Sequence, residues 1–276
     1  MARPIWSGSI SFGLVNVPVK AYTAVRDHDV HFHQLDKESG SRIRNRKVSD
    51  DTGEEVDTDD IEMGFEVSKG KYVTFDPDEL KALRPASTRM IEVTDFVALA
   101  DVDPIYYERT YWLGPDGDAG AKAYQLLLAA MEDRERVAIG TVVVRNKQYL
   151  TAIRPLDGAL AMSTMRFADE VVPRSQVDGV PSRRTKPDAK TLKMAAQLVD
   201  SLSADWKPKQ YKDTYTDELR RRIKAKGSGK KIAEPEAPEP TRNVVDLMEA
   251  LQASVNAAKG KRRKTPTRKA ATRRSA

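Results

Sequence analysis

Apolar and polar residues alternate over short stretches in the first 167 residues, which is the pattern of β-strands. The alternation in residues 9–20 runs on one parity up to Leu14 and on the other from Val15, so we expect a bulge or kink near Gly13. Further strands are predicted at residues 90–99, 105–113, 137–144, 149–154 and 159–167. The third and fourth of these flank a short polar stretch and predict a hairpin.

One helix interrupts the strands. Its apolar positions Tyr124, Leu127, Leu128 and Met131 follow the spacing of a single helical face, and Asp118 is expected to cap it. Strands joined by short turns, with few helices between them, favour an antiparallel sheet or barrel over a parallel α/β fold. The fold class is therefore mixed and β-dominated.

The second half of the chain changes to a helical pattern. Residues 187–203 place Leu192, Ala195, Val199 and Leu202 on one face. Residues 214–226 repeat the spacing with Tyr215, Leu219 and Ile223 and end in a basic last turn. These two stretches predict a helical arm at residues 187–226 that follows a core of residues 1–186.

Three further segments are expected after the arm. Residues 227–240 contain three prolines and no periodicity, which predicts a flexible linker. Residues 241–258 predict a short amphipathic helix, and residues 259–276 predict a disordered basic tail. A short helix between a linker and a tail is marginal alone and needs a partner surface. Its apolar stripe consists of Val244, Leu247, Met248, Leu251 and Val255.

Composition narrows the classes of function. The chain has no cysteine, which excludes disulfides, thiolate metal sites and a cysteine nucleophile. Its apolar runs are far shorter than the roughly 18 residues of a membrane span, and its first residues lack the apolar stretch of a secretory signal. We therefore expect no membrane partner and a cytoplasmic, nucleoid-associated protein.

The net charge of +6 conceals a steep asymmetry along the chain. Residues 1–173 carry a net charge of −8, whereas residues 174–231 carry +9 and residues 259–276 carry +9. An acidic body followed by basic segments indicates an anionic partner, and nucleic acid is the leading candidate. Basic tails alone also bind membranes and RNA without specificity.

Cationic residues gather at three places that we predict to contact DNA phosphates. Three arginines at a spacing of two residues, which a lysine follows, would on a strand line one face. Two further cations lie on or beside the predicted hairpin, and a third follows it. No zinc finger, helix-turn-helix or RRM pattern is present, so reading of base sequence is not expected. The predicted contact residues are Arg42, Arg44, Arg46, Lys47, Arg145, Lys147 and Arg154, and in the tail Lys261, Arg262, Arg263, Lys264, Arg268, Lys269, Arg273 and Arg274.

The three histidines, His28, His31 and His33, are the candidates for a metal site, which would point to an enzyme instead of a DNA-binding protein. On a strand His31 and His33 would share a face, and with nearby acids they could ligate a metal in a nuclease or phosphoesterase. We favour the interpretation that they are ordinary surface or half-buried histidines without a metal. The acid run from Asp50 to Glu62 lacks the spacing of a calcium loop and reads as a solvated loop. We predict no metal, no cofactor and no catalytic residue.

Several segments together resemble the prokaryotic Ku proteins of non-homologous end joining. They are WSGSISFGLVNVPVK (6–20), TGEEV (52–56), GFEVSKGKYV (64–73), DPIYYERTYWLGPD (103–116), RVAIG (136–140), RPLDGAL (154–160), SLSADW (201–206) and YKDTY (211–215). They occur in the order of the family and span residues 1–226.

The resemblance implies a Ku-type antiparallel β-barrel and bridge, two copies of which form a ring-shaped homodimer around duplex DNA. It implies that the arm embraces the partner subunit, that the protein bridges DNA ends, and that it recruits and stimulates an ATP-dependent ligase D. It implies no enzymatic activity. The DNA contacts above are inferred from charge alone. Docking of the ligase is predicted at Leu219, Ile223, Val244, Leu247, Met248 and Leu251; the alternative for the last four is packing onto the body of the protein.

Two other functions stay open at this point. The metal-dependent nuclease requires His31 and His33 to act together. A nucleoid-type coating protein would bind through the basic tail alone and would not distinguish closed circles from linear DNA.

Overall fold

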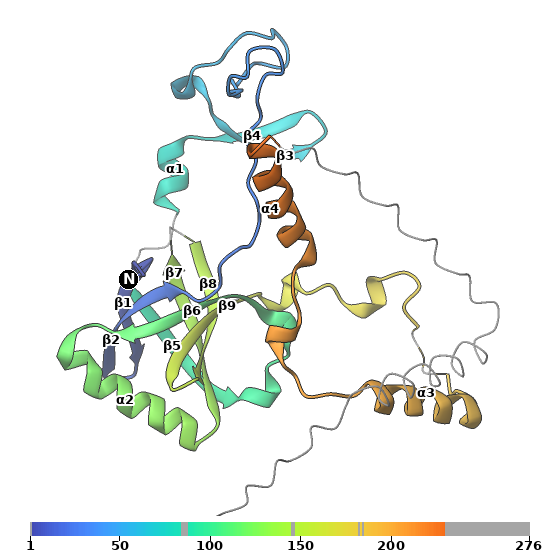
Figure 1. Cartoon of the computed structure of the whole chain (residues 1–276). Helices are drawn as coiled ribbons and strands as arrows, with labels where there is room; N and C mark the ends of the chain where they lie inside the picture. The colour runs from blue at the N-terminus through green and yellow to red at the C-terminus, as the bar shows by residue number, and fades with distance from the viewer. Residues whose placement is uncertain (1, 84–87, 145–146, 182, 184, 230–276) are drawn as a thin grey trace, which may run out of the picture. The chain divides into compact units, whose positions relative to one another are not determined.

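The chain divides into two compact units, Met1–Val177 and Asp178–Ala276 (Figure 1). The computed structural model describes residues 2–83, 88–144, 147–181, 183 and 185–229. The division falls at residue 177, ahead of the boundary at 186 that the sequence predicts. The predicted helix at 241–258 and the basic tail at 259–276 lie outside the described residues, as does most of the predicted linker.

Seven strands of the first unit close into a barrel in the order β1-β2-β6-β9-β8-β7-β5 (Figure 1). Neighbours pair antiparallel, except that β1 and β5 pair parallel at Ser9–Ser11 and Met90–Glu92. The predicted antiparallel barrel is therefore confirmed, with one parallel seam that closes it. The strands are β1 Trp6–Phe12, β2 Val15–Thr23, β5 Met90–Ala98, β6 Tyr107–Pro115, β7 Arg136–Val144, β8 Lys147–Leu156 and β9 Ala159–Met165.

The change of parity near Gly13 marks a hairpin, so the expected bulge is wrong. Phe12 pairs with Val15, and the chain reverses through a two-residue turn in which Gly13 has φ 59°. Ile10 lies opposite Val17, and both are fully buried. Apolar residues of the two strands thus face the same interior, and reversal of the chain, not an inserted residue, moves them to the other parity.

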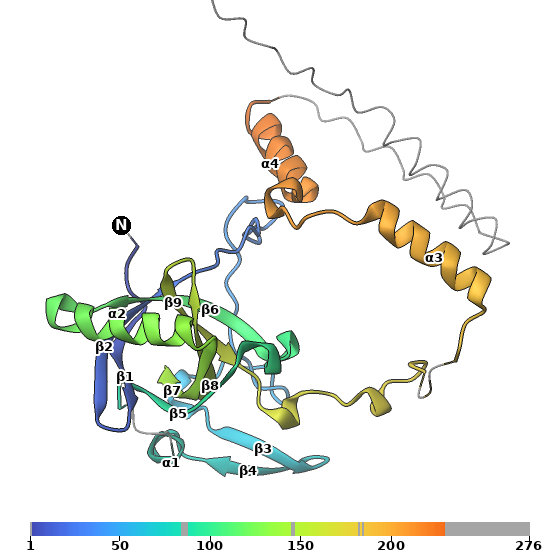
Figure 2. The same cartoon turned by 90° about the horizontal axis from the view of Figure 1, so that it is seen from below.

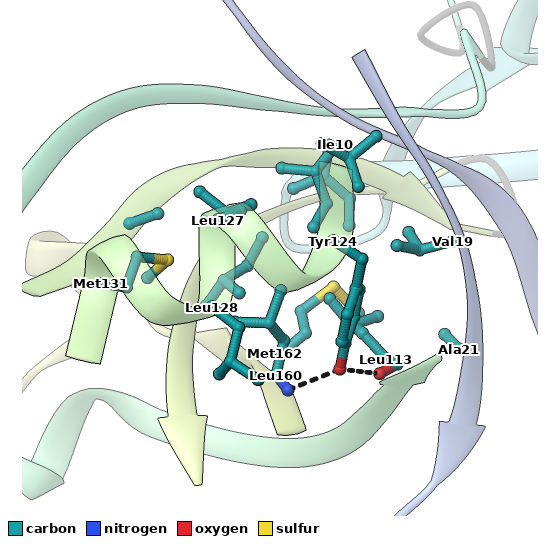
Figure 3. Packing of buried hydrophobic residues seen from close by; sticks show 14 of the residues in the cluster. Ile10, Val19, Ala21, Leu113, Tyr124, Leu127, Leu128, Met131, Leu160 and Met162 are labelled. Atoms are coloured by element: carbon teal, nitrogen blue, oxygen red, sulfur yellow. Dashed lines mark hydrogen bonds between the residues drawn. The ribbon is translucent and has the colours of Figure 1, made fainter. Parts of the chain in front are cut away.

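Helix α2 (Gly117–Asp133) packs its predicted apolar face into the barrel core. Tyr124, Leu127, Leu128 and Met131 are all buried. The Tyr124 hydroxyl donates to the Leu113 carbonyl at 2.7 Å and accepts from the Leu160 amide at 2.7 Å (Figure 3). Burial raises the pKa of Tyr124. This one side chain therefore joins the helix to strands β6 and β9.

The N-cap residue of α2 is Asp116, two residues before the predicted Asp118, which lies in the first turn. The Asp116 carboxylate forms an ion pair with Lys20 at 2.6 Å, and the hydrogen bond of this pair raises the pKa of Lys20. The Asp116 side chain forms no capping hydrogen bond, and the start of the helix is joined to β2 by this ion pair and by the Asp116 amide, which donates to the Pro18 carbonyl at 3.0 Å.

Residues 24–89 form a long insertion between β2 and β5. Most of it has no regular structure, but β3 (Met63–Ser68) and β4 (Lys71–Phe75) form a separate two-stranded sheet, followed by α1 (Pro77–Ala82). These elements are not among those predicted from the sequence. Met63 lies opposite Phe75 and Phe65 opposite Val73, so one face of this small sheet is apolar, and Met63, Phe65 and Val73 are exposed.

The second unit contains α3 (Ala189–Leu202) and α4 (Thr214–Gly227), close to the predicted bounds (Figure 2). The side chain of Asp188 caps α3 and that of Asp213 caps α4. No helix in the described ranges is long and apolar enough to cross a bilayer. Short 3-10 turns occur at η1 Thr58–Asp60, η2 Leu99–Asp101, η3 Pro104–Tyr106, η4 Ala168–Glu170, η5 Arg174–Gln176 and η6 Pro208–Gln210.

Candidate nucleic-acid interface

The cationic segment 42–47 is held between two tight turns of the insertion. In the first, the Gly40 amide donates to the Asp36 carbonyl at 2.9 Å, and in the second the Gly53 amide donates to the Ser49 carbonyl at 2.8 Å. Both glycines have left-handed backbone, with φ 67° and 71°, which glycine adopts without strain. The Asp36 side chain accepts from Ser39, and this bond lowers the pKa of Asp36. The segment between the turns therefore has fixed ends.

Residues 42–47 do not form a regular strand. The segment has only isolated bridges, Leu35 with Arg42 and Val48 with Glu55. The one-faced row of arginines that a strand would impose is therefore lost. The four cations are nevertheless all exposed on one short segment.

The four cations differ in what they contact. The Arg42 guanidinium lies 2.6 Å from the ring of His33, and Arg46 forms an ion pair with Glu55 at 2.6 Å. Within the described ranges, neither Arg44 nor Lys47 forms an ion pair with a carboxylate. Arg44 and Lys47 are therefore the two that can meet phosphate without giving up a protein partner.

The acid run is not kept apart from these cations, because Glu55 within it holds Arg46. The rest of the run forms the second turn and the 3-10 turn η1, in which Asp57 accepts from the Asp59 amide. These contacts are local. The run is an exposed loop and turn, as the sequence indicates.

The histidines do not assemble into a metal site. Among the residues that the structure describes, no group of three His, Asp or Glu side chains converges. The ring of His33 lies against the Arg42 guanidinium, whose positive charge disfavours a metal cation at that position. The arrangement gives the nuclease hypothesis no support.

The cations of β8 lie at opposite ends of that strand, roughly 23 Å apart. Lys147 has the parity of the barrel interior and contacts the Tyr149 ring at 5.1 Å. Arg154 has the other parity and is half-buried near Tyr107. Burial raises the pKa of Tyr107, and the positive charge of Arg154 partly offsets this rise. The structure does not bring these two predicted contacts together, and Arg145 lies outside the described residues.

Arg166 is a cation that the sequence reasoning missed. It lines a small hollow of about 60 Å³ together with Lys147, Tyr149 and two acids, Glu108 and Glu170. The register of β8 and β9, in which Leu150 pairs with Met165, brings the end of β9 beside the start of β8. That pairing of predicted strands was the available signal for placing Arg166 near Lys147.

The predicted docking residues of α4 lie at its surface, with Leu219 half-buried and Ile223 42 % exposed. The other predicted docking residues, Val244, Leu247, Met248 and Leu251, lie outside the described residues, as do the tail cations.

Comparisons with known proteins agree with this architecture. Residues 11–194 match the family model Ku, described as the Ku70/Ku80 beta-barrel domain.

Three bacterial relatives are similar over nearly the whole chain. The non-homologous end joining protein Ku of Anaeromyxobacter sp. (strain K) is 44 % identical and covers 94 % of this chain and 87 % of the relative. Ku 1 of Saccharopolyspora erythraea is 41 % identical, with coverages of 94 % and 80 %, and Ku of Bacillus subtilis is 39 % identical, with coverages of 95 % and 84 %. On the barrel, the matched residues and these relatives, the chain belongs to the Ku family.

Proposed function

We propose that this protein binds the ends of double-stranded DNA as a ring-shaped homodimer in non-homologous end joining, without enzymatic activity. The observation that carries the proposal is the similarity to bacterial Ku proteins over nearly the full chain. The exposed cations of the 42–47 segment and the basic C-terminal charge support an anionic partner.

A closed ring explains how a protein without base-reading elements selects ends. Duplex must be threaded through the ring, so topology supplies the specificity and phosphate contacts supply the affinity. The logarithm of affinity should then fall with the logarithm of salt at a slope of about −0.9 for each phosphate neutralised.

Two apolar surfaces support self-association. Met63, Phe65 and Val73 are exposed on the β3–β4 sheet, and a two-stranded sheet is marginal without a partner. Leu192 and Val199 are exposed on the apolar face of α3. Exposed apolar faces of this kind mark protein interfaces, and a two-fold dimer suits the pseudo-two-fold backbone of DNA.

Recruitment of an ATP-dependent ligase D is the second part of the proposal. Ile223 offers an exposed apolar residue on α4, and the segment 241–258 carries an amphipathic pattern. The double change Leu247→Asp and Leu251→Asp should abolish capture of purified ligase D while leaving DNA binding intact. Unchanged capture would remove this segment from the proposal.

The basic tail has a separate proposed role as a flexible polycation that raises affinity and limits sliding inward from the end. Removing residues 259–276 should weaken binding and flatten the salt slope. A slope that stays the same would show that the tail makes no phosphate contacts.

The deciding experiment compares linear duplex with covalently closed circles across a salt series. Full-length protein and a chain ending near residue 226 should both bind linear DNA and ignore circles. If binding follows the tail and does not distinguish circles, the protein is a nucleoid-type coating protein and end recognition is refuted.

A further inference from the structure

Two aromatic side chains stack on each other at the surface of the connection between α3 and α4. The ring centroids of Trp206 and Tyr211 are 5.1 Å apart and the ring planes differ by 28°. Trp206 is 75 % exposed and Tyr211 is 69 % exposed. Large aromatic residues usually bury their surface, so a stacked pair left in solvent needs an explanation.

The local backbone sets this stack. The 3-10 turn η6 lies between the two rings, with the Gln210 amide donating to the Lys207 carbonyl at 2.9 Å and the Tyr211 amide donating to the Pro208 carbonyl at 3.1 Å. The turn brings Tyr211 against Trp206. The platform is therefore preorganised by the six residues 206–211 and needs no buried core.

Positive charge alternates with the rings. Lys207 follows Trp206, Lys212 follows Tyr211, and Lys209 lies between them, all exposed. Among the described residues, the one ion pair in this group joins Lys207 to Asp205 at 3.8 Å, a long and solvent-exposed contact. The ammonium groups are therefore available to an anion that approaches the rings.

The nearest acidic residue after the stack, Asp213, is the N-cap of α4. The Asp213 carboxylate accepts from the Thr216 amide at 3.0 Å and caps α4. Its charge is directed to the helix start, where it complements the helix dipole.

We propose that the Trp206–Tyr211 stack binds unpaired bases of single-stranded DNA, with Lys207, Lys209 and Lys212 contacting the phosphates between them. Each ring keeps an outer face on which a base can stack, and every base has such a face, so the site needs no sequence preference. Aromatic rings interleaved with cations are the arrangement that holds single strands.

A protein partner fits this surface less well. Lysine is depleted from the cores of protein interfaces because its strongly hydrated ammonium group is costly to bury. Three lysines beside two rings would all have to be accommodated by such a partner. On a single strand the same three charges meet phosphates and release counterions.

The inference rests on the proposed function for the source of the ligand, since DNA ends with overhangs present unpaired bases. The site itself is tested with an oligonucleotide alone. Failure of the stack and failure of end binding are therefore separate results.

The first measurement uses the fluorescence of Trp206 in the full-length protein. Trp6 and Trp112 are the other two tryptophans, and both are partly buried, whereas Trp206 is exposed. A thymidine oligonucleotide of about 15 nucleotides, within the usual site size, should quench the exposed emission. The variant Trp206→Phe, which removes that emission and keeps a ring, supplies the baseline.

The second measurement is affinity for the same oligonucleotide. Trp206→Leu and Tyr211→Leu should each weaken binding roughly 5- to 150-fold, the loss expected for one stacked base. Phe32→Leu is the matched control, because Phe32 is also an exposed aromatic, at 69 %, and lies in the other unit. Affinity for blunt linear duplex and the ratio of linear to circular binding are measured on the same samples.

Three results would overturn the inference. They are an emission that the oligonucleotide leaves unchanged, an affinity that stays within about twofold in both leucine variants, or a change of the native oligomer to monomer in Trp206→Leu by light scattering. The last would assign the stack to contact with a second copy. Loss of end selectivity with the oligonucleotide response intact would refute the proposed function and leave the stack as a single-strand site.

Discussion

The barrel and the second unit differ in how they use apolar residues. Every buried apolar side chain of the described residues belongs to the barrel strands or to α2, between Ile10 and Met165. In the described part of the second unit, the one buried side chain is Thr216, whereas Val199, Leu202 and Trp206 are at least 65 % exposed.

The difference separates stability from association. The barrel closes on itself, so its apolar residues are covered within one chain and their burial stabilises that chain. In the described part of the second unit, apolar residues of the helices such as Val199, Leu202 and Ile223 are left exposed, so they contribute when another molecule arrives. Changes in the barrel should alter unfolding, and changes in the second unit should alter binding.

The largest effect is expected for Leu160→Ala. Leu160 is fully buried in the barrel, and truncation to alanine removes buried carbons and leaves a cavity, which costs about 3 kcal/mol in free energy of unfolding. Leu202→Ala, at a residue 68 % exposed, should change it by less than about 0.5 kcal/mol. Urea denaturation measures both, and equal losses would show that α3 is buried in the protein's solution state.

Tyr124→Phe should cost about 2 kcal/mol, less than the cavity variant. The change keeps the ring but leaves the Leu113 carbonyl and the Leu160 amide without the buried hydroxyl that each contacts. The same denaturation experiment measures it. A loss below about 0.5 kcal/mol would mean that water replaces the hydroxyl at both positions.

The exposed cations should affect binding and not unfolding. Arg44→Gln combined with Lys47→Gln should reduce the slope of log affinity against log salt for linear duplex by about 1.8, the amount expected for two phosphate contacts. The urea midpoint should not change. Arg46→Gln is the matched control, because Arg46 is already paired with Glu55 and should change the slope less. A change of about 0.9 in the Arg46→Gln variant, one full phosphate contact, would show that this pair opens on DNA.

The smallest effect concerns Glu218 on α4. Hydrogen bonds from Arg221 and Arg222 lower the pKa of Glu218 from its ordinary value of 4.5 to about 2. A lowered pKa in the folded state means that the pair stabilises the helix above the ordinary pKa and that this contribution is lost as pH falls through about 2.

Far-ultraviolet circular dichroism between about pH 5 and pH 2 tests this pair. The helical signal of the native protein should fall more over this range than that of Glu218→Gln, which has no such carboxylate to protonate. The difference should be small because the pair is exposed to solvent. Parallel titration curves would show that the pair does not stabilise α4.

Sequence periodicity determined the elements that bury one face. The five later barrel strands and helix α2 were predicted near their observed bounds, because alternation and helical spacing report burial directly. Helices α3 and α4 were predicted as well, since each also has a capping aspartate and one apolar face. The family was inferred from the sequence segments that resemble Ku proteins and from their order along the chain.

Tertiary structure decided what periodicity does not encode. The β3–β4 sheet was not predicted, although Met63, Phe65 and Val67 alternate with polar residues. The apolar residues of this sheet are exposed, so the alternation does not mark a core. Three features depend on residues far apart in the chain or on the turns between them: the parallel pairing of β1 with β5, the ion pair of Asp116 with Lys20 at the start of α2, and the pairing of Arg46 with Glu55. Among the described residues, Arg44 has no such carboxylate partner. A charge is visible in a sequence, but its partner is set by folding, because ion pairs depend on distance in space and not on spacing along the chain.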